Sequence, residues 1–61
     1  MWNFLFEVKD EDSEFCGELF FVQCDTIKEA WYTAHEFFEE ELAYRGRYSD
    51  EEAESMGYDT Y

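Results

Sequence analysis

The first residues alternate regularly between apolar and polar side chains. Even-numbered positions place Trp2, Phe4, Phe6 and Val8 on one face. Odd-numbered positions place Asn3, Leu5, Glu7 and Lys9 on the other. This two-residue period is typical of a strand with one buried face. We therefore predict a strand over residues 2–9.

A second apolar run follows a polar turn at residues 10–13. In residues 14–24 apolar side chains occupy both alternating sets, namely Phe15, Leu19 and Phe21 against Cys16, Phe20, Val22 and Cys24. This mixed alternation predicts a strand whose two faces are both partly covered, with a bulge at Gly17. Two strands joined by a short polar turn predict an antiparallel hairpin.

Residues 27–43 have helical spacing instead. Thr26 precedes them and Glu29 stands three residues later, which is the pattern of a capping box at a helix start. The apolar stripe consists of Ile27, Ala30, Trp31, Ala34, Phe38 and Leu42. A period of about 3.6 residues predicts an amphipathic helix, roughly 25 Å long. We expect residues 44–48 to form a turn.

A shorter helix is predicted over residues 50–56. Ser49 and Glu52 form a second capping box, acidic residues fill the first turn, and Gly57 is suited to end a helix. The fold class is therefore α+β, in the order ββαα, with an antiparallel hairpin packed on the main helix in one domain over residues 1–61. Such a hairpin leaves both edges open, so we also expect a homodimer.

Composition adds an unusual combination of charge and aromatic rings. The 61 residues include 17 Asp and Glu but only 4 Lys and Arg, which gives a formal net charge of −13. Aromatic residues make up 23% of the chain, which supplies enough apolar surface for folding despite this charge. The charge argues against direct binding to nucleic acid or to an anionic membrane, because both favour Lys and Arg.

The N-terminal pattern and the apolar runs bear on location. No segment has the ~20 consecutive apolar residues of a membrane span. Charged residues from Glu7 onward interrupt any signal-peptide pattern. We therefore expect a cytoplasmic protein, and Met1 leads us to expect a complete small gene product.

The two cysteines are predicted to be free. Cys16 and Cys24 would lie about 26 Å apart in one extended strand, too far for a disulfide. We predict two free, mostly buried thiols, as suits a reducing compartment.

The carboxylates are the strongest candidates for function. They cluster in residues 10–14, 39–41 and 50–54, and further ones lie on the polar side of the predicted main helix. Carboxylates one to two turns apart on a helix are separated by about 6–11 Å, which is comparable to the spacing of phosphates on a DNA strand. The residues that we expect to contact a partner are Glu36, Glu39, Glu40, Asp50, Glu51, Glu52, Glu54 and Tyr58. The alternative is a solvated surface that only provides solubility.

Metal binding and catalysis have weaker support. Asp10, Asp12 and Glu14 alternate as in a calcium loop, but Phe15 and Phe21 occupy the positions where that motif needs Gly and Glu. The cysteines and the single histidine lack the spacing of zinc ligands. We therefore predict no metal site, no cofactor and no enzymatic activity.

Two further features leave alternatives open. Arg45 and Arg47 carry half of the positive charge, and we favour their pairing with residues 39–41 over a contact with nucleic acid. Tyr58 and Tyr61 are either packing residues or exposed anchors for a partner.

In size and composition, over its whole length, this acidic and aromatic chain resembles the small phage proteins that counter host defences. They comprise anti-CRISPR proteins, anti-restriction proteins and uracil-DNA glycosylase inhibitors, and many are DNA mimics. The resemblance implies a non-enzymatic inhibitor that imitates the charge of nucleic acid. Its partner would be the basic groove of a nuclease, a CRISPR effector or another DNA-processing protein of the host.

A second, local resemblance involves residues 25–30 (Asp-Thr-Ile-Lys-Glu-Ala) together with Ala34, Glu36 and residues 39–42. These are similar to the helix of HicB-type antitoxins, which follows a hairpin. The chain lacks that family's Pro-rich and Gly-rich segment, its third strand before the helix and its DNA-binding tail. This resemblance implies the alternative function, an antitoxin-like or structural module that binds a protein through its apolar edge.

Overall fold

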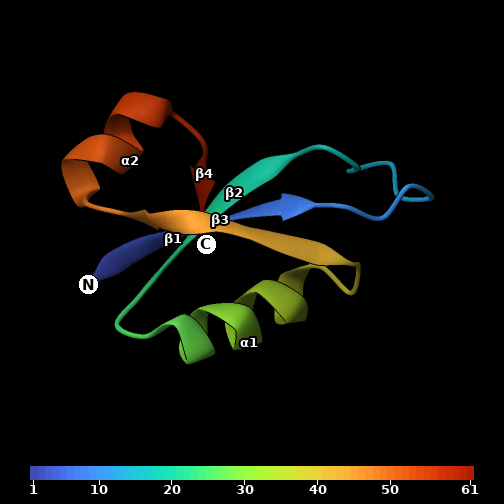
Figure 1. Cartoon of the computed structure of the whole chain (residues 1–61), viewed down its shortest axis with the longest axis horizontal. Coiled ribbons are helices and arrows are strands. Elements are labelled where there is room, and N and C mark those ends of the chain that lie inside the picture. Colours follow the sequence, from blue (N-terminus) through green and yellow to red (C-terminus); the bar gives the residue numbers. More distant parts are fainter.

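The predicted N-terminal hairpin forms the centre of a four-stranded sheet (Figure 1). The computed structural model describes residues 1–61, and its strands lie in the order β3-β1-β2-β4. The elements along the chain are β1 (Trp2–Val8), β2 (Leu19–Cys24), α1 (Ile27–Phe37), β3 (Leu42–Tyr48), α2 (Asp50–Met56) and β4 (Asp59–Thr60). β1 is antiparallel to both β2 and β3, whereas β4 is parallel to β2. The α+β class is confirmed, with two strands more than predicted.

The predicted extension of the main helix to residue 43, and the turn after it, are wrong. α1 ends at Phe37, and residues 42–48 form β3 instead. A run of glutamates at residues 39–41 is unfavourable at the negative end of a helix dipole. In β3, Leu5 of β1 pairs with Gly46 while Phe6 pairs with Tyr44, so Arg45 is an extra residue that bulges. Gly46 has a φ of +129°, which an L side chain rarely adopts.

The predicted second strand is too long at its beginning. Residues 9–18 form a loop instead, because short polar side chains in this segment accept hydrogen bonds from nearby backbone N–H groups. Asp10 accepts a hydrogen bond from the Asp12 N–H (3.0 Å), and Ser13 accepts one from the Phe15 N–H (3.0 Å). Gly17 lies in this loop at a φ of +89° and does not form a strand bulge.

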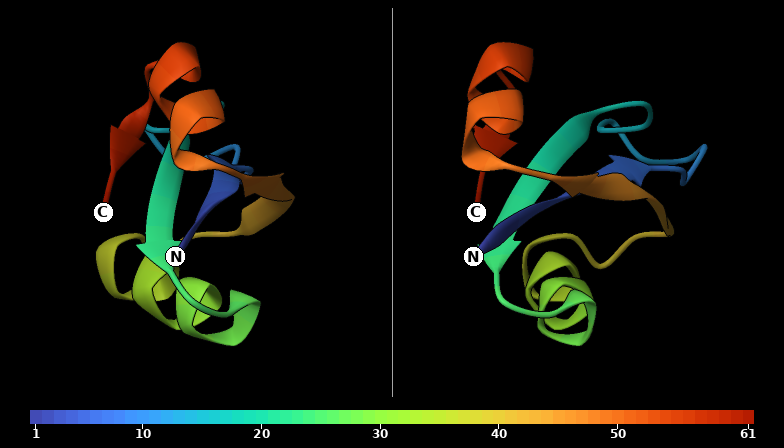
Figure 2. Two further views of the ribbon diagram at one scale, coloured as in Figure 1. Left: turned by 90° about the vertical axis from the view of Figure 1, so that its left-hand side faces the viewer. Right: turned by 60° about the vertical axis from the view of Figure 1, so that its left-hand side comes forward.

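Both faces of the sheet are covered, as the mixed alternation of β2 predicted. Figure 2 shows α1 on one side of the sheet and α2 on the other. The core on the α1 side consists of Phe4, Phe6, Val8, Phe20, Val22, Cys24, Ala30 and Ala34. The smaller core on the α2 side consists of Leu5, Phe21 and Ala53. Phe6 is fully buried, with its ring centroid 5.7 Å from that of Phe20 and 4.8 Å from that of Trp31.

Local signals at the helix ends are largely confirmed. Ser49 and Glu52 form the predicted capping box, and Gly57 ends α2 in the left-handed conformation. At α1 the Thr26 hydroxyl accepts a hydrogen bond from the Glu29 N–H (3.3 Å), which is half of the predicted box.

The hairpin edges that suggested a homodimer are paired within the chain. β3 pairs with β1, and the short β4 pairs with β2. The reason for expecting a dimer is therefore weaker than the sequence indicated, and dimerisation stays a prediction.

The cysteines are free, but only Cys24 is buried. Cys16 is exposed because it lies in the loop of residues 9–18 and not in a strand. Burial is the main cause that raises the pKa of the Cys24 thiol; a backbone hydrogen bond at Thr26 lowers this pKa, and the nearby carboxylates of Glu29 and Asp25 raise it further.

Replacing Phe6 by Ala should unfold most of the protein at room temperature. Loss of a buried Phe costs about 3–5 kcal/mol, close to the whole stability of a small domain. The measurement is urea unfolding followed by circular dichroism. Tyr32→Ala is the control, because Tyr32 is 74% exposed on α1. A Phe6→Ala protein as stable as Tyr32→Ala would contradict this account of the core.

The two thiols should differ in their reaction with a disulfide reagent such as DTNB. Cys16 should react rapidly in the folded protein, whereas Cys24 should react only after unfolding, because burial and a raised pKa leave little accessible thiolate. Absorbance of the released thiolate gives both rates, which should rise with pH. Cys16→Ser should remove the rapid phase alone; equal rates for the two thiols would refute the assignment.

Candidate functional site

One group of carboxylates gathers at one end of the molecule. We call it the acidic end, and it consists of Asp10, Glu11, Asp12, Glu14, Glu39, Glu40 and Glu41. Two segments far apart in sequence lie together there (Figure 1). The Lys9 N–H donates to the Glu41 carbonyl (2.8 Å), and the rings of Phe15 and Phe38 are 5.8 Å apart. The antiparallel pairing of β1 with β3 therefore brings the carboxylates of both segments to the same end of the molecule.

A second group lies on α2, on the other face of the sheet. It consists of Asp50, Glu51, Glu52 and Glu54. The molecule measures 32 × 23 × 15 Å, and α2 lies toward the opposite end of its long axis from the acidic end (Figure 1). The structure thus separates the predicted contact residues: Glu39 and Glu40 belong to the acidic end and Glu36 adjoins it on α1, whereas the rest lie on or beside α2.

Three of the predicted contact residues are less free to meet a partner, because their carboxylates form hydrogen bonds within the protein or are partly buried. Asp50 accepts hydrogen bonds from the side-chain amides of buried Asn3 (2.8 Å) and of Gln23 (3.2 Å). The Glu52 carboxylate accepts hydrogen bonds from the backbone N–H and the hydroxyl of Ser49 in the capping box of α2. One carboxylate oxygen of Glu40 is buried without a hydrogen-bond partner. Of the predicted carboxylates only Glu40 is half-buried; Asp50 and Glu52 are exposed despite their hydrogen bonds, as are Glu36, Glu39, Glu51 and Glu54.

Tyr58 lines a pocket of about 500 Å³ between α2 and the sheet, together with Asp50 and Glu54. Its ring centroid is 5.9 Å from that of Phe21, and its side chain is 39% exposed. Tyr58 therefore packs on the sheet and is also accessible, so both predicted roles fit its position.

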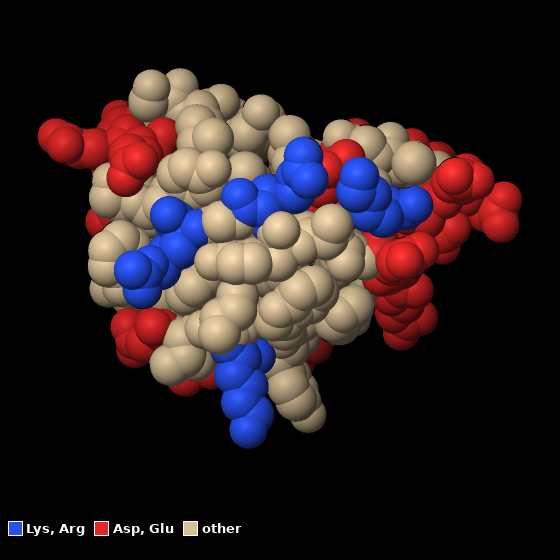
Figure 3. Space-filling view, in the orientation of Figure 1, with Lys and Arg blue, Asp and Glu red and all other residues tan.

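Three of the four Lys and Arg side chains, those of Lys9, Arg45 and Arg47, form a band between the two acidic groups, whereas Lys28 lies on α1. Figure 3 shows this band across the middle of the view, with Asp and Glu toward both ends and a further positive side chain below, apart from the band. Glu7 holds both Arg45 (3.2 Å) and Lys9 (3.5 Å), while Arg47 lies 4.1 Å from the ring of Trp2. The predicted pairing of the arginines with residues 39–41 is wrong, because the β3 strand places Arg45 beside β1.

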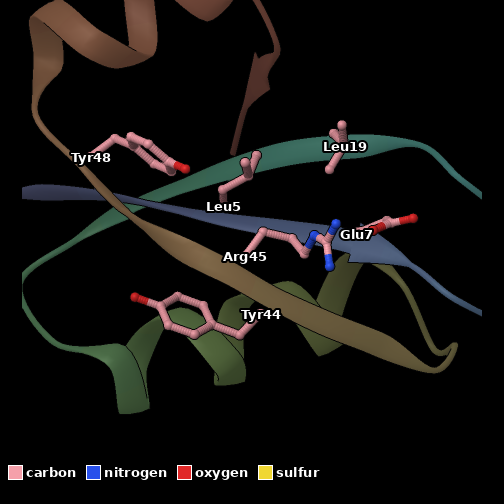
Figure 4. Close-up of a pocket in the computed structure, with 6 residues that line it drawn as sticks. All are labelled: Leu5, Glu7, Leu19, Tyr44, Arg45 and Tyr48. Atoms are coloured by element: carbon pink, nitrogen blue, oxygen red, sulfur yellow. Dashed lines mark ion pairs between the residues drawn. The ribbon is translucent and has the colours of Figure 1, made fainter.

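A groove lies next to this band, beside the part of the sheet that α2 covers (Figure 4). Its volume is about 520 Å³, and its lining consists of Leu5, Glu7, Leu19, Tyr44, Arg45 and Tyr48. The guanidinium of Arg45 points toward Glu7, which neutralises it (Figure 4). The groove therefore offers apolar contacts from Leu5 and Leu19 beside the ion pair of Glu7 and Arg45.

The sequence did not single out an exposed cluster of rings beside the acidic end. We call it the aromatic patch, and it consists of Phe15, Phe37, Phe38 and Tyr61. Ring centroids are 5.8 Å apart for Phe15 and Phe38, 5.8 Å for Phe38 and Tyr61, and 4.9 Å for Phe37 and Tyr61. Phe37 is 57% exposed and Tyr61 is 42% exposed. The sequence signal for this patch is Phe37, an apolar residue that stands beside the predicted helical stripe and within an acidic stretch.

No set of three His, Cys, Asp or Glu side chains is placed to hold a metal ion. His35 stacks on Trp31 with 5.6 Å between ring centroids. Neither helix is long and apolar enough to cross a membrane.

Salt should stabilise this protein. The formal charge is −13, whereas only three ion pairs form, so screening should remove more repulsion than attraction. Raising sodium chloride from about 0.01 M to about 1 M shortens the Debye length from about 30 Å to about 3 Å. We expect the melting temperature to rise by roughly 4–8 °C, which corresponds to about 1 kcal/mol in a domain of this size.

Differential scanning calorimetry measures this shift. The neutral variant Glu11→Gln, Asp12→Asn, Glu14→Gln should respond less to salt than the natural chain. A melting temperature that falls with salt would show that the ion pairs outweigh the repulsion.

Comparison with known proteins leaves the family open: no protein-family model matches the chain, and no curated protein or solved structure shows significant similarity to it.

Proposed function

We propose that this protein is a non-enzymatic inhibitor that occupies the basic nucleic-acid-binding groove of a DNA- or RNA-processing protein. A restriction nuclease or a CRISPR effector in the cytoplasm of a host cell is the kind of target that fits. The observation that supports it is the acidic end, where the loop after β1 and the segment before β3 place their carboxylates side by side. The acidic end is the part that would enter the groove.

Rigid placement favours this role over mere solubility. Asp10 and Ser13 fix the loop through hydrogen bonds to backbone N–H groups, and the bond from Lys9 to Glu41 fixes the second segment against the first. These bonds fix the backbone that carries the carboxylates, so less chain entropy is lost when the carboxylates meet Lys or Arg of a partner. Their field also accelerates association with a basic surface.

The test is displacement of a fluorescent DNA duplex from purified DNA-binding proteins. Suitable probes are a type I restriction enzyme, a Cas9–guide RNA complex and a uracil-DNA glycosylase. The natural chain should release the duplex from at least one of them, with an affinity that falls steeply as salt rises. Failure to displace DNA from all three at low salt would refute the proposal for these target classes.

Matched charge reversals locate the contact. One triple variant reverses charge at the acidic end: Glu11→Lys, Asp12→Lys, Glu14→Lys. The other makes the same change in net charge on and beside α2: Glu51→Lys, Glu54→Lys, Asp59→Lys. The first variant should lose displacement by about tenfold or more, which corresponds to about 1.4 kcal/mol, and the second should lose much less. Equal losses would mean that net charge acts without a specific end.

A protein-interaction module, antitoxin-like or structural, is the second candidate, and the aromatic patch favours it. Binding through exposed Phe37 and Tyr61 would depend on buried apolar area and would change little with salt. The salt series of the displacement assay separates the two candidates.

A further inference from the structure

The aromatic patch is held rigidly despite its exposure. The Tyr61 N–H donates to the Phe21 carbonyl (2.8 Å), and the Tyr61 carbonyl accepts from the Gln23 N–H (3.3 Å). The Tyr61 ring then contacts both Phe37 and Phe38, and Phe38 stacks on buried Phe20 at 4.6 Å. Side chains fixed in this way lose little conformational entropy on binding.

Exposed carboxylates flank three of the four patch residues along the chain. Glu14 precedes Phe15, Glu36 precedes Phe37 and Glu39 follows Phe38, and all three glutamates are exposed. An apolar centre with a charged rim is the usual anatomy of a protein interface, in which aromatic residues supply most of the affinity.

We propose that the aromatic patch is an interaction surface for a protein whose own apolar contact site is rimmed by Lys and Arg. Charge complementarity selects this partner. A second copy of the chain would bring like-charged rims together, with −13 on each molecule. The cellular role of the patch rests on the proposed function, whereas its chemical preference is a property of the surface alone.

The rings and the carboxylates act on different steps of binding. Exposed carboxylates mainly raise the association rate and make it salt-dependent. Rings that enter a dry pocket mainly lower the dissociation rate.

A synthetic peptide tests this preference without knowledge of the natural target. The probe is a short amphipathic helix of Leu and Lys, and its reference is an oligolysine with the same number of lysines. The variants are Phe37→Ala and its matched control Tyr32→Ala, since Tyr32 is also an exposed aromatic of α1 but its ring does not belong to the ring pairs of the patch. Binding rates and affinities are measured by fluorescence anisotropy and stopped flow.

The Leu–Lys peptide should bind the natural chain more tightly than oligolysine. Phe37→Ala should weaken Leu–Lys binding by about tenfold, mostly through faster dissociation, and leave oligolysine binding unchanged. Tyr32→Ala should change neither. Phe15→Ala, on the other side of the patch, should reproduce the loss, and circular dichroism should show that each variant stays folded.

Equal effects of Phe37→Ala and Tyr32→Ala would overturn the proposal, as would equal affinity for the two peptides. Dimerisation of the natural chain that Phe37→Ala abolishes, measured by analytical ultracentrifugation, would overturn it in favour of a second copy. A chain that fails to displace DNA but binds the Leu–Lys peptide through Phe37 would refute the proposed function and leave this surface assignment standing.

Discussion

The antiparallel pairing of β3 with β1 is the constraint on which the rest of the structure depends. It covers one edge of the hairpin and requires α1 to end at Phe37, so that residues 38–41 can reverse the chain. It also brings Glu41 to the backbone of Lys9 and Arg45 to the carboxylate of Glu7. A single strand pairing therefore closes the sheet, gathers the acidic end and builds the positive band that separates it from α2.

Burial on two faces explains how so short and charged a chain holds together. A domain of about 60 residues buries only about 60% of the surface that its unfolded chain exposes. Here the central strands are buried on both sides, because α1 covers Phe6 and Phe20 while α2 covers Leu5 and Phe21. The rings supply the apolar area that offsets the repulsion among the carboxylates.

The sequence predicts those features whose signals are local. The alternation in β1, the capping box at Ser49 and the end of α2 at Gly57 each depend on neighbouring residues. β3 was missed because Leu42 keeps the spacing of the helical stripe, and only the pairing with β1 makes the extended form favourable. The acidic residues could be named, but not their grouping, since that grouping results from contacts between distant segments. The contact between Phe37 and Tyr61 also joins distant segments, because the pairing of the short strand β4 with β2 brings the C-terminal residue beside α1.

Crowded carboxylates also connect stability with the proposed function. At the acidic end, residues 10–14 and 39–41 repel one another in the free protein, and the repulsion opposes folding. Lys and Arg of a partner would neutralise this charge, so a basic surface would bind the folded chain in preference to the unfolded one. Any ligand with that preference stabilises the fold in proportion to the logarithm of its concentration over its dissociation constant. A charge distribution that costs stability in isolation is therefore consistent with a protein that acts in a complex, where the proposed role of the aromatic patch would be to supply the apolar contact that charge alone does not.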